Sequence, residues 1–133
     1  MSHDGIDIVI PTGTAIQNAR NTSLIGNTGG ELTRDGAHMA FGVGRYIVAA
    51  TWFQSLLAPI FGVSILGNTC VHDTLYNAEV AYDEALQEAH EEDPVNNMYF
   101  PPIYVTTSNR ELCQLCAMWA TIDKWTIHGD NNE

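Results

Sequence analysis

The amino-acid sequence predicts an α/β protein that is rich in helix, and three features of the 133-residue chain support this. Residues 6–10 (IDIVI) form a short β-branched run closed by Pro11, which is typical of a buried strand in a parallel sheet. Apolar side chains recur every three or four residues over 43–57 and over 75–92, which indicates two amphipathic helices. Because one parallel strand cannot form a sheet, the strand needs partners that this sequence does not supply. We therefore expect the chain to be the last part of a larger fold.

A further helix and a long loop are expected directly after the strand. Residues 14–20 (TAIQNAR) can begin this helix, with Thr12 or Thr14 as its cap. Residues 21–36 are rich in Asn, Thr and Gly and are typical of a surface loop. The loop is long for a compact domain, and long loops often carry function.

Prolines mark the expected ends of the two long helices. Pro59 is expected to end the helix over 43–57, and Asp93-Pro94 to end the helix over 75–92. An extended piece and a weaker helix complete the chain, over residues 101–108 and 111–127.

The net charge of the chain indicates which classes of partner it does not bind. Asp and Glu outnumber Lys and Arg by 16 to 5, and the formal net charge is -11. Such a surface repels phosphate backbones and anionic lipid head groups, so we expect no nucleic-acid and no membrane partner. The uncharged stretch 46–67 is long enough to span a bilayer. Its central Gln54, Ser55 and Pro59 favour a buried helix of a soluble protein instead.

The cysteines and the N-terminus bear on the compartment. Three cysteines make no disulfide framework, so the composition does not require an oxidising environment. The N-terminal residues contain no basic region followed by a long apolar run, so no signal peptide is predicted. We expect a cytoplasmic protein if the chain is whole as written, and a secreted or periplasmic one if an upstream part is missing.

The stretch LTRDGAHMAFGVGRYIVAATWF (32–53) contains a candidate catalytic pair, Asp35 and His38, just before the long helix. A histidine that acts as a general base is usually held in one tautomer by a carboxylate on its other ring nitrogen. Gly36 allows a tight turn that brings such side chains together. The same residues also fit a helix cap, with Asp35 as the cap and His38 as a surface residue of the first turn. The spacing alone favours the cap, because Asp-x-x-His pairs are common.

The residues around this pair favour the catalytic interpretation. IVIPTGTAIQNAR, followed by a loop and the stretch 32–53, resembles the C-terminal part of the SGNH (GDSL-like) hydrolases and esterases. The likeness is strongest to a bacterial branch with an Asp-Gly-x-His block, and it extends over residues 6 to about 69. The resemblance implies a flavodoxin-like, three-layer α/β fold, of which this chain supplies the last parallel strand and the helices around it.

The resemblance also implies roles for the pair. His38 would be the general base and Asp35 its orienting carboxylate, activating a serine that attacks an ester carbonyl. In this family the serine belongs to an N-terminal Gly-Asp-Ser-like or Gly-Asn-Ser-like block, and none of the five serines here follows such a block. The resemblance therefore implies that the chain supplies the acid–base half of a serine ester hydrolase, with an O-acetylated carbohydrate as one candidate substrate. We expect the chain to be inactive alone.

Two other groups of residues are weaker candidates. Arg20 and Arg34 flank the long loop and could contact a substrate carboxylate or sugar, although a solvated role or a salt bridge is simpler. Cys113 and Cys116 have the spacing of a zinc or redox site. Their neighbours are apolar and helix-like, which favours small core residues, so we expect no metal and no cofactor.

The chain is expected to comprise two segments. Residues 1–69 form the SGNH-like segment, and residues 70–133 form a helical extension packed on the same domain. The substrate of the chain would be a small-molecule ester or an acetylated carbohydrate, once the missing N-terminal half is supplied. The rival hypothesis is a non-catalytic helical domain that forms a homo-oligomer or binds a partner, because the strand edge at 6–10 and the long apolar run favour association.

Overall fold

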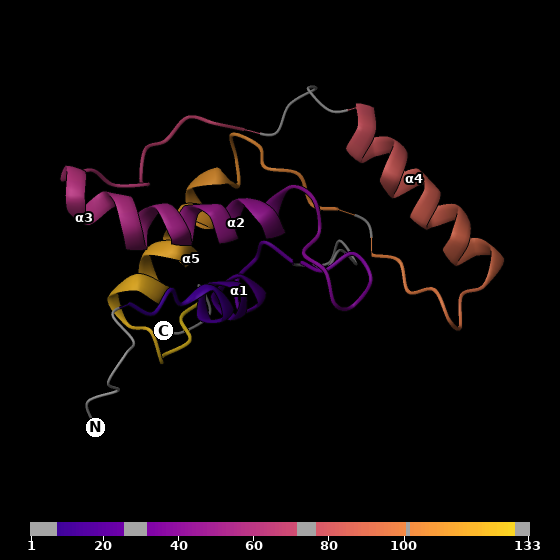
Figure 1. The fold of residues 1–133 in the computed structure, drawn as a ribbon, viewed down its shortest axis with the longest axis horizontal. Coiled ribbons are helices and arrows are strands. Elements are labelled where there is room, and N and C mark those ends of the chain that lie inside the picture. Colours follow the sequence, from indigo (N-terminus) through magenta and orange to yellow (C-terminus); the bar gives the residue numbers. More distant parts are fainter. Residues whose placement is uncertain (1–7, 26–31, 72–76, 101, 130–133) are drawn as a thin grey trace.

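The computed structural model describes residues 8–25, 32–71, 77–100 and 102–129. Within these ranges the regular structure is helical (Figure 1). The elements in chain order are α1 (Thr12–Arg20), α2 (Val43–Trp52), the π-helical turn η1 (Phe53–Leu57), α3 (Ala58–Phe61), α4 (Asn77–Glu92) and α5 (Arg110–Ile122). Helices α1, α2 and α5 pack on one another and form the body of the molecule, and α4 lies to one side.

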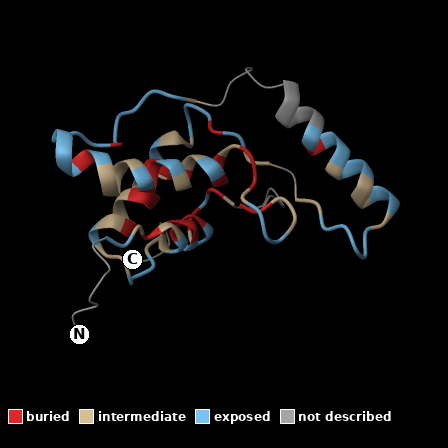
Figure 2. Cartoon of the chain, in the orientation of Figure 1, coloured by how far each residue is buried: buried red, intermediate tan, exposed pale blue. Residues whose placement is uncertain are grey.

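The core lies where α1, α2 and α5 meet, and Figure 2 shows the buried residues gathered there. Small side chains line the contact between α1 and α5 and let the two helices approach closely. Larger side chains of α2 fill the space above them, and burying each Val or Ile contributes about 1.5–3 kcal/mol. The fully buried residues of the three helices include Ala15, Ala19, Val43, Ile47, Cys113, Cys116 and Ala120.

The predicted α/β fold, with a last parallel strand of a flavodoxin-like sheet, is wrong for the described residues. Residues 8–10 are irregular, and the pairings found are the isolated bridges Thr33–Met39 and Gly42–Ile103. Residues 6 and 7 of the predicted strand lie outside the described ranges. A β-branched run forms a strand only beside another strand, and no strand of the described chain lies there. Ile8 and Val9 are instead exposed in the irregular lead into α1.

The predicted helices occur, with some of their ends displaced. α1 begins at Thr12 without a side-chain cap, and the Thr14 hydroxyl donates to the Lys124 carbonyl at 2.6 Å. α4 ends at Glu92, just before the predicted stop. α5 ends at Ile122, short of the expected end at 127.

The long helix does not end at Pro59 as expected. It continues from α2 through η1 into α3, and Gly62 ends it in the left-handed conformation at φ +64°. The wider turn η1 interrupts the α-helical hydrogen bonds just before the proline. Pro59 therefore lies in the first turn of α3, where its missing N–H costs little. None of the described helices combines the length and the apolar character that a bilayer span requires.

Candidate functional site

Asp35 and His38 meet at the tip of a tight turn that leads toward α2. The Arg34 N–H donates to the His38 carbonyl at 2.9 Å and closes the turn. Gly36 adopts φ +79°, a left-handed conformation that glycine takes at little cost. The residue before α2 is Gly42, so Asp35 does not cap this helix.

The Asp35 carboxylate contacts both the ring and the backbone of His38. Its Oδ2 lies 2.6 Å from His38 Nδ1, and its Oδ1 accepts the N–H groups of His38 at 2.7 Å and Ala37 at 3.0 Å. These hydrogen bonds, above all that from the His38 N–H, lower the pKa of Asp35 to about 2. An ionised carboxylate only accepts, so Nδ1 carries the proton and Nε2 of the neutral ring is the basic atom. The His38 side chain is 67% exposed, so a reacting group can approach it.

Two glycines that follow the turn, Gly42 and Gly44, lie close against backbone atoms of other segments. Gly42 has φ +77°, and a Cβ atom there would lie 2.4 Å from the Ile103 carbonyl oxygen. That oxygen accepts the Val43 N–H at 2.7 Å, which ties the start of α2 to the segment before α5. A Cβ atom on Gly44 would lie 2.6 Å from the carbonyl oxygen of the buried Leu32. The segment that joins the turn to α2 therefore makes close backbone contacts, and a side chain at either glycine would prevent them.

The two arginine candidates lie in different surroundings. Arg20 is the exposed last residue of α1. The guanidinium carbon of Arg34 lies 5.1 Å from the Phe41 ring centroid and 4.8 Å from that of Tyr82 on α4. Its Nε atom is buried without a hydrogen-bond partner in the described part of the chain. The Arg34 side chain thus links the turn to α4 through aromatic rings.

Tyr82 and Phe41 are the residues of this site that sequence reasoning missed. No local signal pairs residues so far apart in the chain, because their contact arises from tertiary structure.

The cysteine pair belongs to the core. Cys113 and Cys116 are both buried on α5, and burial raises the pKa of the Cys113 thiol to about 12. This thiol stays protonated at neutral pH and packs as a small apolar group. Among the described residues, no three His, Cys, Asp or Glu side chains are grouped to hold a metal ion.

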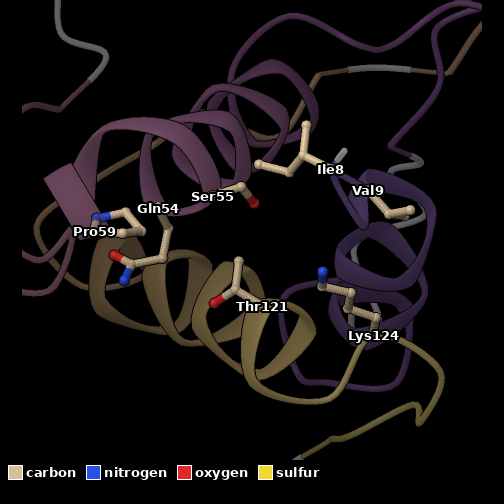
Figure 3. A pocket seen from close by; sticks show the side chains of 7 residues that line it. All are labelled: Ile8, Val9, Gln54, Ser55, Pro59, Thr121 and Lys124. Carbon is tan, nitrogen blue, oxygen red and sulfur yellow. The ribbon is translucent and has the colours of Figure 1, made fainter. Parts of the chain in front are cut away.

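A cavity of about 130 Å³ lies between the lead into α1, η1 and the end of α5 (Figure 3). Its lining includes Ser55, whose hydroxyl is buried without a hydrogen-bond partner among the described residues. The helical rise of about 1.5 Å per residue puts Ser55 roughly 18 Å along the helix from Val43. This serine is therefore remote from the end of the helix where His38 lies. The lining residues are Ile8, Val9, Gln54, Ser55, Pro59, Thr121 and Lys124.

The comparisons with known proteins identify a family without an assigned activity. Residues 2–91 match the family model described as a domain of unknown function, DUF4886. No curated protein and no solved structure matches the chain. The matched range contains α1, the Asp35–His38 turn and α2, and it ends within α4. Because this range is more than half of the chain, the protein belongs to the DUF4886 family.

Proposed function

We propose that this chain is the part of a serine ester hydrolase that carries the general base, His38, and its orienting carboxylate, Asp35. The nucleophilic serine comes from another polypeptide or from an upstream segment. The observation that supports the proposal is the 2.6 Å contact between Asp35 Oδ2 and His38 Nδ1. The resemblance to SGNH hydrolases over residues 6 to about 69, which includes the same Asp-Gly-x-His block, also motivates the proposal.

The division of the carboxylate oxygens favours a base over a simple turn. An Asp that only stabilises a turn needs one oxygen for the backbone N–H groups two and three residues ahead. Here Oδ1 takes both of those N–H groups, and Oδ2 is left for the imidazole. This arrangement fixes the tautomer in which Nε2 accepts a proton.

The chemistry follows from this tautomer. Nε2 takes the proton of the serine hydroxyl as its oxygen attacks the ester carbonyl, and the imidazolium then protonates the departing alcohol. Water, deprotonated by the same Nε2, attacks the acyl carbonyl, and the imidazolium returns the proton to the departing serine oxygen as the acid is released. Asp35 stays ionised and stabilises the imidazolium. An O-acetylated carbohydrate is one substrate of this class, and that choice rests on the family resemblance alone.

The test compares p-nitrophenyl acetate hydrolysis by the isolated chain with hydrolysis by the chain combined with the polypeptide encoded directly upstream. We expect turnover only in the combination, and His38→Ala should lower kcat by about a thousandfold or more. His128→Ala is the matched control, because His128 lies after α5 and its ring contacts the Trp119 ring, with centroids 6.1 Å apart. Activity that survives His38→Ala would rule out His38 as the general base. An inactive combination would exclude the upstream polypeptide as the source of the serine.

We propose self-association as the second candidate function, on a different observation. Exposed apolar side chains follow one another along the end of α2, η1 and α3, in a stretch from 46 to 71 without a charged residue. Two copies of an acidic chain repel each other where their charged surfaces face. An uncharged apolar surface avoids this repulsion and can bring two copies together. The exposed residues, here named the α3 surface, are Trp52, Leu57, Ile60, Phe61 and Val63.

Light scattering tests the second candidate. We expect a dimer or larger species that Phe61→Glu converts to the 14.6 kDa monomer. Val95→Glu is the matched control, because Val95 is 85% exposed and lies after α4, outside the α3 surface. A wild-type monomer at high protein concentration would exclude self-association.

A further inference from the structure

Helix α4 and the segment after it form one structural unit. Tyr99 in this segment has its pKa raised, first by burial and then by the negative charge of Asp83 on the helix. The His90 ring contacts the Asn97 carbonyl, and the Asp93 carboxylate accepts both the N–H and the side-chain amide of Asn96. We call residues 77–100 the α4 unit.

The α4 unit packs on none of the other described helices, yet it reaches the Asp35–His38 turn (Figure 1). The Phe100 N–H donates to the Arg34 carbonyl at 3.1 Å. The Met98 side chain covers the turn so closely that a Cβ atom on Gly36 would lie 2.7 Å from its terminal methyl. Tyr82 completes the contact from the helix itself, with its ring centroid 4.8 Å from the Arg34 guanidinium carbon. The unit is therefore joined to the body at the turn that holds the candidate base.

Two aromatic rings lie beside Arg34, the residue that begins the turn. The rings of Phe41 and Tyr82 meet edge to face, with centroids 5.6 Å apart and planes at 89°. Both rings also contact the Arg34 guanidinium, at 5.1 Å and 4.8 Å. The Arg34 Nε is buried without a hydrogen-bond partner among the described residues, and the two rings supply cation–π contacts to the guanidinium. Arg34 directly precedes Asp35, so a fixed Arg34 restricts where the carboxylate can lie.

We propose that Tyr82 is a positioning residue for the Asp35–His38 pair, and that its ring acts through Arg34 and Phe41 to hold the turn in its hydrogen-bonded conformation. This inference rests on the proposed function, because it concerns the geometry of the same general base. It assigns the α4 unit a role: docking of this unit keeps the imidazole in its orientation, and release of the unit frees the turn. The ring face of Tyr82 carries the effect, since no described hydrogen bond involves its hydroxyl.

The test uses the isotopically labelled full chain and follows three hydrogens by NMR. These are the Nδ1–H of His38 and the two N–H groups bonded to Asp35 Oδ1, those of Ala37 and His38. We expect Tyr82→Ala and Tyr82→Leu to raise solvent exchange of both backbone hydrogens by about tenfold, and to broaden the Nδ1–H signal. Tyr82→Phe should match the wild type because it retains the ring. Ala and Leu are good helix formers, so helix content by circular dichroism should stay unchanged.

Each other outcome contradicts the proposal. Unchanged exchange in Tyr82→Leu would show that the ring does not hold the turn. Equal acceleration across α1 and α5 would indicate general destabilisation, and a Tyr82→Phe variant as mobile as Tyr82→Ala would assign the effect to the hydroxyl. Val95→Ala is the control for a change near α4 that removes no ring contact. None of these signals depends on ester turnover, so a failure of the catalytic assignment is distinguishable from a failure of this one.

Discussion

The Asp35 carboxylate holds His38 at two places at once, through the imidazole Nδ1 at 2.6 Å and through the backbone N–H at 2.7 Å. The second contact fixes where the side chain leaves the backbone, and the first fixes which way the ring faces. A single residue thereby sets both the position and the tautomer of the candidate base.

The order of the turn should depend on pH through Asp35. Its pKa of about 2 lies below the ordinary value of 3.8, so the ionised carboxylate stabilises the folded turn above pH 3.8. That contribution is lost as the pH falls through about 2, because a protonated carboxyl accepts these hydrogen bonds poorly. We expect the Ala37 and His38 N–H resonances to move toward irregular-chain positions in a transition centred near about pH 2.

The control for this titration is Asp35→Asn, which removes the titrating group. Its N–H resonances should not show the transition. A wild-type transition centred near the ordinary carboxyl pKa of 3.8 would contradict the hydrogen-bonded turn.

Gly42→Ala should destabilise the protein strongly. A Cβ atom there would lie 2.4 Å from the Ile103 carbonyl oxygen at φ +77°, so both the backbone and the neighbouring segment must shift. We expect a loss of about 3 kcal/mol or more in the free energy of unfolding from urea denaturation.

Gly62→Ala is the matched control for the clash. Gly62 also has positive φ, at +64°, but nothing lies within 4 Å of its Cβ position. Gly62→Ala should lower the free energy of unfolding only by the cost of the left-handed conformation, about 1–2 kcal/mol. Equal effects at the two glycines would show that the Ile103 contact is unimportant.

The three cysteines should differ in reactivity toward a thiol reagent such as Ellman's reagent. Cys70 is exposed, whereas Cys113 and Cys116 are buried, and the pKa of Cys113 is raised to about 12 by burial. At pH 8 in native buffer we expect one thiol to react rapidly, and in urea all three. Rapid native labelling of Cys113 would contradict the packing of α5.

Gln114→Leu should cost about 1–2 kcal/mol, because it removes the three hydrogen bonds of a buried side chain whose partners are half-buried or exposed. The Gln114 amide donates to the Tyr46 hydroxyl and the Asn68 carbonyl, both at 2.8 Å, and its oxygen accepts the Gly67 N–H at 3.0 Å. Urea denaturation measures the loss.

Gln87→Leu is the matched control for this network. Gln87 is on the surface of α4 and contacts Glu91 at 3.0 Å. We expect a change within about 0.5 kcal/mol, as for other exposed positions. A comparable loss in both variants would mean that the hydrogen bonds of Gln114 contribute little to stability.

The sequence was informative where structure depends on neighbours in the chain. The three- and four-residue spacing over 43–57 and 75–92 located α2 with η1, and α4. Glycine in the Asp-Gly-x-His block indicated a tight turn, and Gly36 does adopt positive φ. The roles assigned to Asp35 and His38 stay a prediction.

The sequence was misleading where structure depends on distant partners. Residues 6–10 have strand composition, but within the described residues 8–10 are irregular. Nothing in the sequence indicated that the Arg34 guanidinium lies against Phe41 and Tyr82. Composition cannot reveal either outcome, because each depends on what another part of the fold places beside the residue.

By itself, the sequence determined the helices and the tight Asp35–His38 turn, because both close their hydrogen bonds within a few residues. Tertiary structure decided that the β-branched run at 8–10 forms no strand and that the helix continues past Pro59. It also brought Tyr82 of α4 against Arg34. The physical reason is range: a helix or a turn satisfies its own backbone, whereas a strand or a cation–ring contact requires a partner that only the folded chain supplies.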